Sequence, residues 1–224
     1  MIDLPNITYV TISGIQNYDL KWLILYAEYA KKYFNFGKFL IITPNSNKYK
    51  HDFIEFMYTE PLSYNGYNQF CKNSLKDYIN TDYCIVYQDD GAICNPQLWD
   101  NEFLSYDYIG APWGNDAPVE IGMKNIIGNG GFSLRSKNFI ELSATVPNKK
   151  GVEDLCLCYR NRGYLLENGI KFPDVNFAKK FSVEYPVDKD HNEQNTFGFH
   201  KPKHGDMLFL NSYRQKVLQE LNLC

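Results

Sequence analysis

The chain has 224 residues, of which 44% are hydrophobic, and its formal net charge is −3. This length predicts a single domain over residues 1–224 with a sizeable core, and the slightly negative charge argues against a nucleic-acid partner. The six cysteines form no CxxC pair and no zinc pattern, so we expect reduced thiols. No signal-peptide pattern is visible, and the most apolar stretch, residues 20–34, is too short and too charged to cross a bilayer; we therefore expect no transmembrane segment and a cytoplasmic location.

The first half of the chain alternates between strand and helix patterns. Residues 7–14 form an apolar run that ends at a glycine, which predicts a buried strand. Asn17 or Asp19 is expected to cap the following helix, because apolar residues then recur at helical spacing as far as about Phe34. The further predicted elements are strand 38–43, a short strand near 53–57, helix 67–79 and strand 83–87.

This alternation predicts an α/β fold with a mostly parallel central sheet flanked by helices, because parallel strands need crossover connections. Ligands of such sheets bind beyond the carboxyl ends of the strands, where residues 11–14, 43–46 and 88–91 fall. The second half of the chain is more irregular. Its predicted elements are strand-like pieces in 106–113 and 130–136 and helices in 152–163 and 205–221.

Two adjacent carboxylates, Asp89 and Asp90, follow the apolar run of the strand that ends at Tyr87. Neighbouring carboxylates repel each other, and strands ordinarily avoid aspartate. At the carboxyl end of a buried strand, such a pair suits Mg²⁺ or Mn²⁺, which relieves the repulsion and could hold a diphosphate. A solvated Asp-Asp-Gly turn is the alternative that the same residues allow.

Five motifs in the chain resemble a family of glycosyltransferases known mostly from viral and bacterial genomes, which looks like the GT-A fold. The motifs are, in order, "YQDDG", "YDYIGAPWG", "GNGGFSLRS", "VEDLCL" and "FGFHK". The resemblance covers most of the chain, from about Thr8 to Lys201. It implies transfer of a sugar from a nucleotide diphosphate sugar, a UDP-sugar by default, to a hydroxyl of a glycan acceptor, with dependence on Mn²⁺ or Mg²⁺ and inversion of configuration. For a viral protein, the expected location is the host cytoplasm.

The resemblance also implies where metal and donor bind. Enzymes of the GT-A fold carry an Asp-any-Asp motif after a central strand, and the matching positions here are Gln88, Asp89 and Asp90. Asp90 is then the main metal ligand with Asp89 assisting. Gln88, in place of the first Asp, removes one charge from the metal site and departs from the usual polar contact to ribose or sugar. His200 matches the histidine that such enzymes bring to the metal from near the C-terminus, and Lys201 would reach a phosphate. A surface histidine–lysine pair is the alternative.

An inverting reaction needs a base on the acceptor side. The candidates are Glu153 and Asp154, at the start of a predicted helix, and Asp154 is the first choice. Carboxylates near a helix N-terminus are also favoured by the helix dipole, so a purely structural role explains the presence of either residue as well as a catalytic role does.

Six further residues are expected to contact the sugar or the nucleotide. They are Trp113, Asn129, Gly130 and Gly131 for the sugar, and Thr11 and Ser13 for the base and ribose. Glycines allow backbone to approach a sugar closely, an asparagine can bond hydroxyls, and a tryptophan can stack on a sugar face. A tight turn and an ordinary core tryptophan explain the same residues, and short hydroxyl side chains are common at strand ends.

Two other functions compete with glycosyl transfer. One is a catalytically inactive protein that binds a nucleotide sugar or a glycan, which Gln88 favours. The other is a sugar nucleotidyltransferase, which needs a glycine-rich basic loop after the first strand; residues 11–19 contain one glycine and no Lys or Arg, which argues against it. We expect the other histidines, His51, His191 and His204, to be solvated.

Overall fold

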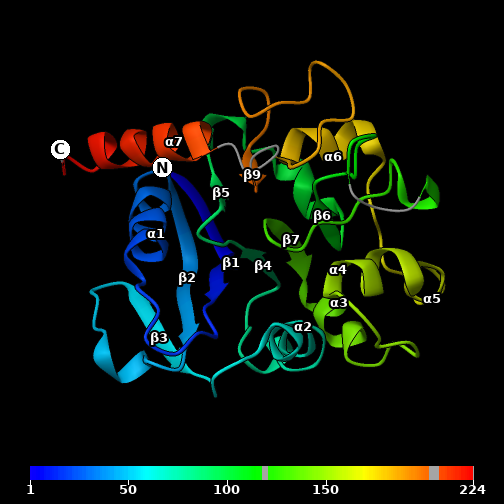
Figure 1. Ribbon diagram of the computed structural model, residues 1–224, viewed down its shortest axis with the longest axis horizontal. Coiled ribbons are helices and arrows are strands. Elements are labelled where there is room, and N and C mark those ends of the chain that lie inside the picture. The colour runs from blue at the N-terminus through cyan, green and yellow to red at the C-terminus, as the bar shows by residue number, and fades with distance from the viewer. Residues whose placement is uncertain (118–120, 202–206, 224) are drawn as a thin grey trace.

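The computed structural model describes residues 1–117, 121–201 and 207–223 (Figure 1). Its centre is a six-stranded sheet with strand order β3-β2-β1-β4-β7-β6. The strands are β1 (Ile2–Ile12), β2 (Phe34–Thr43), β3 (Ile54–Tyr58), β4 (Tyr83–Val86), β6 (Tyr108–Gly110) and β7 (Ser133–Ser136). The first four run parallel, and β7 is antiparallel to both of its neighbours.

A second, three-stranded sheet has the order β5-β9-β8. Its strands are β5 (Gly91–Ile93), β8 (Ser182–Val183) and β9 (Gly198–His200). Gly91 pairs with His200 in the antiparallel β5–β9 ladder. This pairing carries a histidine from near the C-terminal end of the chain to the residue that directly follows Asp90.

Helices lie on both sides of the large sheet (Figure 1). They are α1 (Lys21–Tyr33), α2 (Tyr64–Asn73), α3 (Lys137–Ser143), α4 (Glu153–Leu155), α5 (Arg162–Glu167), α6 (Val175–Phe181) and α7 (Met207–Glu220). A π-helical turn, Cys156–Arg160, continues α4. Short 3₁₀ turns cover Ser46–Lys48, Leu75–Asp77, Pro96–Leu98, Asn101–Ser105 and Ile121–Met123.

The core has two parts, one on each face of the sheet, because side chains alternate along a strand. In β1, Tyr9 belongs to the cluster that contains α1 and α7, and Val10 belongs to the cluster that contains α2 and α3. Tyr9 also stacks on Tyr87, with ring centroids 4.1 Å apart. The parallel strands are buried on both faces, so their sequences are apolar runs rather than alternating patterns.

The α1 region differs in detail from the expectation. The helix begins at Lys21, and Leu20, its N-cap residue, makes no side-chain cap bond. Asp19 does accept a hydrogen bond from the Lys21 backbone N–H at 3.0 Å, whereas Asn17 accepts from the Lys48 ammonium instead. Strand β2 starts directly after the helix, at Phe34, and not at residue 38 as expected. Its first residues pair with the beginning of β1, where Ile2 lies opposite Phe34.

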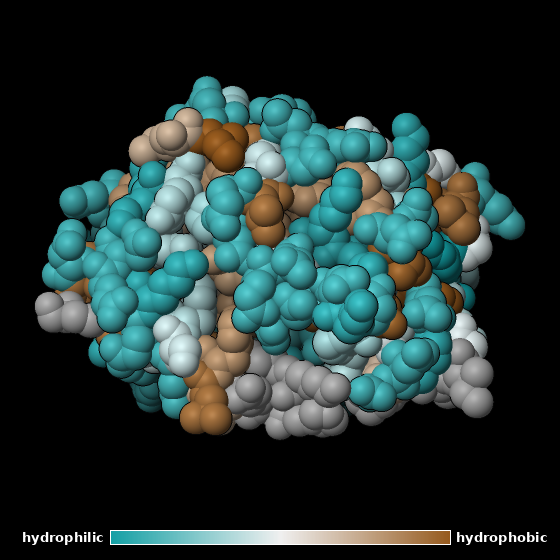
Figure 2. Space-filling model, turned by 90° about the horizontal axis from the view of Figure 1, so that it is seen from above, coloured by the Kyte–Doolittle hydropathy of each residue, from teal (hydrophilic) through white to brown (hydrophobic). Residues whose placement is uncertain are grey.

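Exposed apolar side chains are scattered over the surface. One face, shown in Figure 2, is mostly hydrophilic with small separate hydrophobic groups. The large hydrophobic residues that are exposed come from different elements and include Ile15, Tyr58, Tyr64, Leu166 and Leu208. Among the helices that the structure describes, none has both the length and the apolar character needed to cross a membrane.

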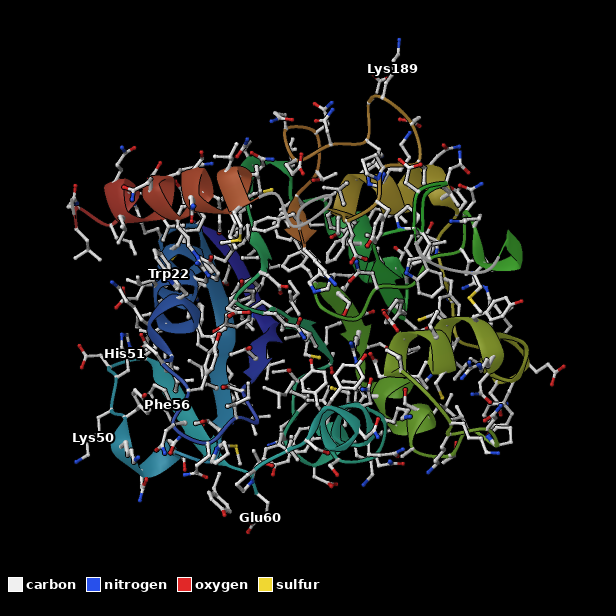
Figure 3. All side chains as sticks on the ribbon, in the orientation of Figure 1. Trp22, Lys50, His51, Phe56, Glu60 and Lys189 are labelled. Atoms are coloured by element: carbon white, nitrogen blue, oxygen red, sulfur yellow. The ribbon has the colours of Figure 1, made fainter. Side chains whose placement is uncertain are left out.

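The expectation of a solvated His191 is wrong. Its side chain is 1% exposed, its Nε2 contacts the Ser182 carbonyl oxygen at 2.9 Å, and its Nδ1 accepts from the Val187 backbone N–H at 3.2 Å. The expectation rested only on the absence of a motif around His191, which does not report burial; Lys189, two residues earlier, does project outward (Figure 3). His51 contacts Glu28 at 3.0 Å. His204 lies outside the described residues.

Replacement of His191 by Gln tests this role. Burial lowers the pKa of His191 below its usual 6.5. A base with a lowered pKa contributes stability that is present above the unfolded pKa and is lost as the pH falls through the folded pKa. We expect His191→Gln to lose about 1–3 kcal/mol at pH 8, because buried bonds are lost, and to decline less than the wild type between pH 7 and pH 5. Urea unfolding at each pH measures both effects; parallel pH curves would contradict the assignment.

Candidate functional site

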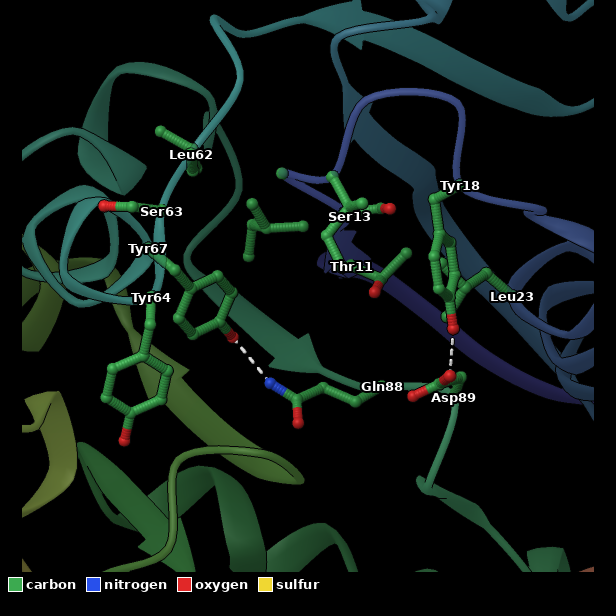
Figure 4. Close-up of a pocket in the computed structure, with 13 residues that line it drawn as sticks. Thr11, Ser13, Tyr18, Leu23, Leu62, Ser63, Tyr64, Tyr67, Gln88 and Asp89 are labelled. Atoms are coloured by element: carbon green, nitrogen blue, oxygen red, sulfur yellow. Dashed lines mark hydrogen bonds between the residues drawn. The ribbon is translucent and has the colours of Figure 1, made fainter.

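Two cavities adjoin at the carboxyl ends of β1 and β4. The first has a volume of about 430 Å³ and is mostly apolar (Figure 4). Its lining includes Thr11, Ser13, Gly14, Tyr18, Leu23, Leu62, Ser63 and Asp89. The second has a volume of about 530 Å³. Its lining includes Asp90, Trp113, Gly130, Gly131, Glu153, Asp154, Glu184, Tyr185, His200 and Lys201. Tyr64, Tyr67 and Gln88 line both, so the cavities share a wall.

The turn after β4 sends the adjacent aspartates into different cavities. Gln88 and Gly91 exchange backbone hydrogen bonds of 2.8 and 3.2 Å, so Asp89 and Asp90 are the central residues of a tight turn. Asp89 lines the first cavity and accepts a hydrogen bond from the Tyr18 hydroxyl (Figure 4). Asp90 lines the second. Asp89 and Asp90 therefore do form a turn, as the alternative explanation of the sequence had it. Because each side chain lines a cavity, the same turn can also bind a ligand.

His200 lies over this turn. Its Nε2 is 3.5 Å from Asp90 Oδ1 and 3.1 Å from Gln88 Oε1, and the Gln88 amide nitrogen donates to the Tyr67 hydroxyl at 2.7 Å. Asp89 contacts Tyr18 instead, so the expected grouping of Asp89 with Asp90 and His200 as metal ligands is not what the structure shows. The physical reason is the tight turn, which separates consecutive side chains.

A metal fits the groups that do converge. Over the described ranges, no three His, Cys, Asp or Glu residues gather as a metal site, and the third donor here is the Gln88 carboxamide oxygen. Mg²⁺ binds its ligands at about 2.1 Å, which places neighbouring ligands about 3 Å apart. The separations of 3.1 and 3.5 Å among Gln88, Asp90 and His200 suit such an ion, and mixed oxygen and imidazole donors suit Mn²⁺.

The charges around His200 favour its protonated form when no cation is bound. Burial disfavours the imidazolium, but the contact with Asp90 and the charges of Glu184 and Asp154 outweigh burial and raise the pKa of His200 above 6.5. Burial likewise opposes ionisation of Asp90, but His200 outweighs it and holds the Asp90 pKa below 3.8. A metal that takes His200 as a ligand therefore displaces a proton.

The sequence analysis missed Glu184, which lies beside His200. Glu184 Oε1 is 3.7 Å from His200 Nδ1, and its other oxygen accepts from the Asn129 amide. Burial is the main reason that the pKa of Glu184 rises to about 7, and the charges of Asp154 and Asp90 add to it. The residue follows β8 in an irregular segment, outside every recognised motif, so no signal in the sequence pointed to it.

The two candidate bases differ sharply in their surroundings. Asp154 faces the second cavity and accepts from the backbone N–H groups of Gly130 and Leu155, at 3.3 and 2.7 Å. Glu153 is 4% exposed, and its carboxylate is 2.7 Å from the guanidinium of Arg135. Because Glu153 is held in this buried ion pair, it is poorly placed to take a proton from a substrate.

In the glycine-rich segment, Gly130 and Gly131 line the second cavity, and both lie close against the side chains of other site residues. Asn129 is 1% exposed, lies behind the cavity wall and donates to Glu184. A side chain at Gly131 would overlap the His200 ring, and one at Gly130 would overlap the Glu153 carboxylate. The expectation that Asn129 bonds sugar hydroxyls is not what this arrangement shows, because its amide is already occupied.

The other expected site residues lie at the cavities. Trp113 is 4% exposed, packs against Gly128 and reaches the second cavity with only a small part of its surface. Thr11 and Ser13 line the first cavity. Lys201 lines the second, and its backbone N–H donates to the Asp90 carbonyl oxygen at 2.7 Å.

The sequence pattern of the family described as "Protein of unknown function (DUF5672)" matches residues 52–200. No curated protein was found to match the chain. Among solved structures, the chain is similar to a glycosyltransferase involved in the glycosylation of the major capsid of PBCV-1, with 12% identity and a TM-score of 0.50 over 95% of this chain and 98% of that one. The bifunctional IspDF from Campylobacter jejuni matches with 9% identity and a TM-score of 0.48 over 85% of this chain, which spans about half (52%) of that protein.

At 12% identity, the likeness to the capsid glycosyltransferase concerns the fold. It extends over nearly the whole of both chains, and the six-stranded, mostly parallel sheet flanked by helices is the architecture that the two share. The predicted GT-A-like α/β fold class is therefore confirmed.

Replacing Glu184 by Gln should change how stability depends on pH. An acid whose pKa is raised on folding, here from 4.5 to about 7, stabilises the fold below pH 4.5 and loses that contribution as the pH rises through 7. Without added metal, Glu184→Gln should therefore be more stable than the wild type at pH 8, by at most about 3 kcal/mol, and lose this advantage towards pH 5. Urea unfolding with chelator present measures the difference; an equal effect at both pH values would disprove it.

Proposed function

The chain belongs to the family described as "Protein of unknown function (DUF5672)", and from its fold and paired cavities we propose that it is a metal-dependent glycosyltransferase. It would move a sugar from a nucleoside diphosphate sugar, with a UDP-sugar as the default donor, to a hydroxyl of a glycan acceptor. The fold is shared with a glycosyltransferase involved in the glycosylation of the major capsid of PBCV-1, which supports the proposal.

The observation that carries the proposal is a pair of adjoining cavities, one mostly apolar and the other lined by charged side chains. The first is mostly apolar and offers Thr11, Ser13 and the Asp89 carboxylate, which suits a nucleoside with its flat base and its ribose hydroxyls. The second gathers charged side chains, which suits a diphosphate, a sugar and an acceptor. Gln88 lies on the shared wall, so a nucleotide sugar that spans both cavities has its diphosphate beside the turn.

In this proposal Asp90, His200 and Gln88 hold a Mn²⁺ or Mg²⁺ ion. Bound there, the ion would neutralise negative charge on the diphosphate. Lys201 adds a point charge at the same wall of the cavity and stabilises the charge that develops on the leaving diphosphate. Asp89 stays with the nucleoside, because it faces the first cavity.

Asp154 is the proposed base. The acceptor hydroxyl transfers its proton to the Asp154 carboxylate while its oxygen bonds to the anomeric carbon, and the bond from that carbon to the diphosphate breaks with the electron pair leaving on the diphosphate. Attack opposite to the leaving group inverts the configuration. Asp154 is chosen over Glu153 because it lacks the buried cation that holds its neighbour.

A protein that binds a nucleotide sugar without transferring it is the second candidate. Gln88 favours it, because a neutral side chain stands where the Asp-any-Asp motif of GT-A enzymes carries its first carboxylate. Incubation with donor and a panel of glycan acceptors separates the two: binding without release of the nucleoside diphosphate would select this candidate.

Metal dependence is tested through Asp90. We expect a nucleoside diphosphate to bind the wild type more tightly with Mn²⁺ than with chelator, and Asp90→Ala to lose this difference, because Asp90 supplies the only carboxylate among the three proposed ligands. Asp89→Asn, a carboxylate change in the other cavity, should weaken nucleoside binding while the effect of Mn²⁺ persists. Isothermal titration calorimetry measures both; equal affinity in Mn²⁺ and chelator would rule out a bridging metal.

The base is tested with Asp154→Asn, which keeps the side-chain size and an acceptor oxygen. Donor affinity should survive, while transfer should fall by about 10²–10⁴-fold, the usual contribution of a positioned base. Glu153→Gln should instead lower the free energy of unfolding, because it leaves the buried Arg135 without its counter-charge. Product analysis by NMR reports the anomeric configuration; retention together with an active Asp154→Asn variant would refute the mechanism.

A further inference from the structure

The two ring nitrogens of His200 face different groups. Nε2 points to Gln88 Oε1 and Asp90 Oδ1, at 3.1 and 3.5 Å. Nδ1 is buried, has no hydrogen-bond partner within ordinary distance, and has Glu184 Oε1 as its neighbour at 3.7 Å. A largely buried imidazole thus lies between two carboxylates of the second cavity, Asp90 near Nε2 and Glu184 near Nδ1.

We infer that Glu184, held by Asn129, is a positioning residue that keeps a proton on His200 Nδ1 when a cation occupies Nε2. The inference rests on the proposed metal-dependent function. A neutral imidazole has one N–H and one lone pair, so the nitrogen that binds a metal must lose its proton while the other keeps one. Without a cation, the Gln88 oxygen at 3.1 Å favours a proton on Nε2. Once a cation takes its place, the carboxylate beside Nδ1 stabilises the proton there, and such partners are usual behind histidine ligands.

Glu184 is itself held in place. The Asn129 amide nitrogen donates to one Glu184 oxygen, so the other oxygen is the one that faces His200. Asn129 is fixed in turn, because its side-chain oxygen accepts from the Gly131 backbone N–H at 3.2 Å and its backbone has a φ of +59°. Asparagine adopts this left-handed conformation more readily than most residues.

Gly131 supplies the space for the ring. A Cβ atom at this position would overlap Nε2 and the neighbouring carbons of His200. The segment 128–131 therefore acts on His200 in two ways: Gly131 admits the ring, and Asn129 places the carboxylate behind it. This accounts for a motif that sequence reasoning assigned to sugar contact.

The tautomer of His200 is the direct readout. With diamagnetic Mg²⁺ and a nucleoside diphosphate bound, long-range ¹H–¹⁵N NMR should show the proton on Nδ1 in the wild type, with the His200 signals assigned by their loss in His200→Gln. In Glu184→Gln, the Asn129 donor retains the amide oxygen, so the amide NH₂ group turns to Nδ1, and at the same ligand concentrations the proton should remain on Nε2. Mn²⁺ affinity, measured by electron paramagnetic resonance with a nucleoside diphosphate present, should fall by about 10–100-fold.

Glu60→Gln is the matched control, because it makes the same chemical change at an exposed residue on a distant edge of the molecule (Figure 3). It should alter neither the tautomer nor the affinity. Asn129→Gly tolerates the positive φ and releases Glu184, so it should also weaken Mn²⁺ binding, and it decides the question if Glu184→Gln does not fold.

The positioning role is overturned if Glu184→Gln leaves both the tautomer and the Mn²⁺ affinity unchanged. It is also overturned if transfer falls while both stay as in the wild type, because Glu184 then acts on the acceptor and not on His200. Failure of the proposed function has a different signature: the wild type itself would bind neither Mn²⁺ nor a nucleoside diphosphate, whereas failure of the positioning role alone leaves wild-type Mn²⁺ binding intact.

Discussion

A buried guanidinium on the central sheet organises the second cavity. Arg135 on β7 is 1% exposed, and burial alone would lower its pKa; the carboxylate of Glu153 outweighs burial and keeps the pKa above the usual value. Arg135 also donates to the Gly130 carbonyl and the Ser133 hydroxyl, both at 3.0 Å. One side chain thus ties the glycine-rich segment, β7 and the start of α4 together, and these are the elements that bring Asp154 to the cavity.

A second buried cation supports the same segment from the other side. Lys72 on α2 is 1% exposed, and its ammonium donates to the carbonyl oxygens of Lys149 and Gly151, at 2.7 and 3.0 Å. Buried charges are costly unless they are paired and hydrogen-bonded, so removal of Arg135 leaves the Glu153 carboxylate buried without its partner, and removal of Lys72 takes away both of its bonds to the loop before α4. The end of this loop and the start of α4, which carries Asp154, are therefore each held by a buried cation.

The sequence predicted the framework of the site better than its details. The apolar runs and helical spacing located the parallel strands, and the rule for their carboxyl ends placed the Gln88–Asp90 turn at the cavities. The divergence of Asp89 and Asp90 depends on the exchange of backbone bonds between Gln88 and Gly91, which propensity does not show. Glu184 was missed because its role depends on contacts with two residues distant in the chain, Asn129 and His200, and pairings of this kind leave no local pattern.

The charged side chains of the second cavity affect one another's protonation. Asp90, Asp154 and Glu184 line it together with His200 and Lys201, so carboxylates outnumber cationic groups. Burial raises the pKa of Glu184 and the neighbouring carboxylates add to it, while Asp90, Glu184 and Asp154 raise the pKa of His200 against the effect of burial. In the proposed function, Asp90 and His200 would hold a divalent cation, whose charge would offset the excess of carboxylates in place of the imidazole proton. Glu184 would then face a neutral His200 through Nδ1, so one carboxylate would take up a proton when the site lacks a cation and orient His200 when a cation is bound.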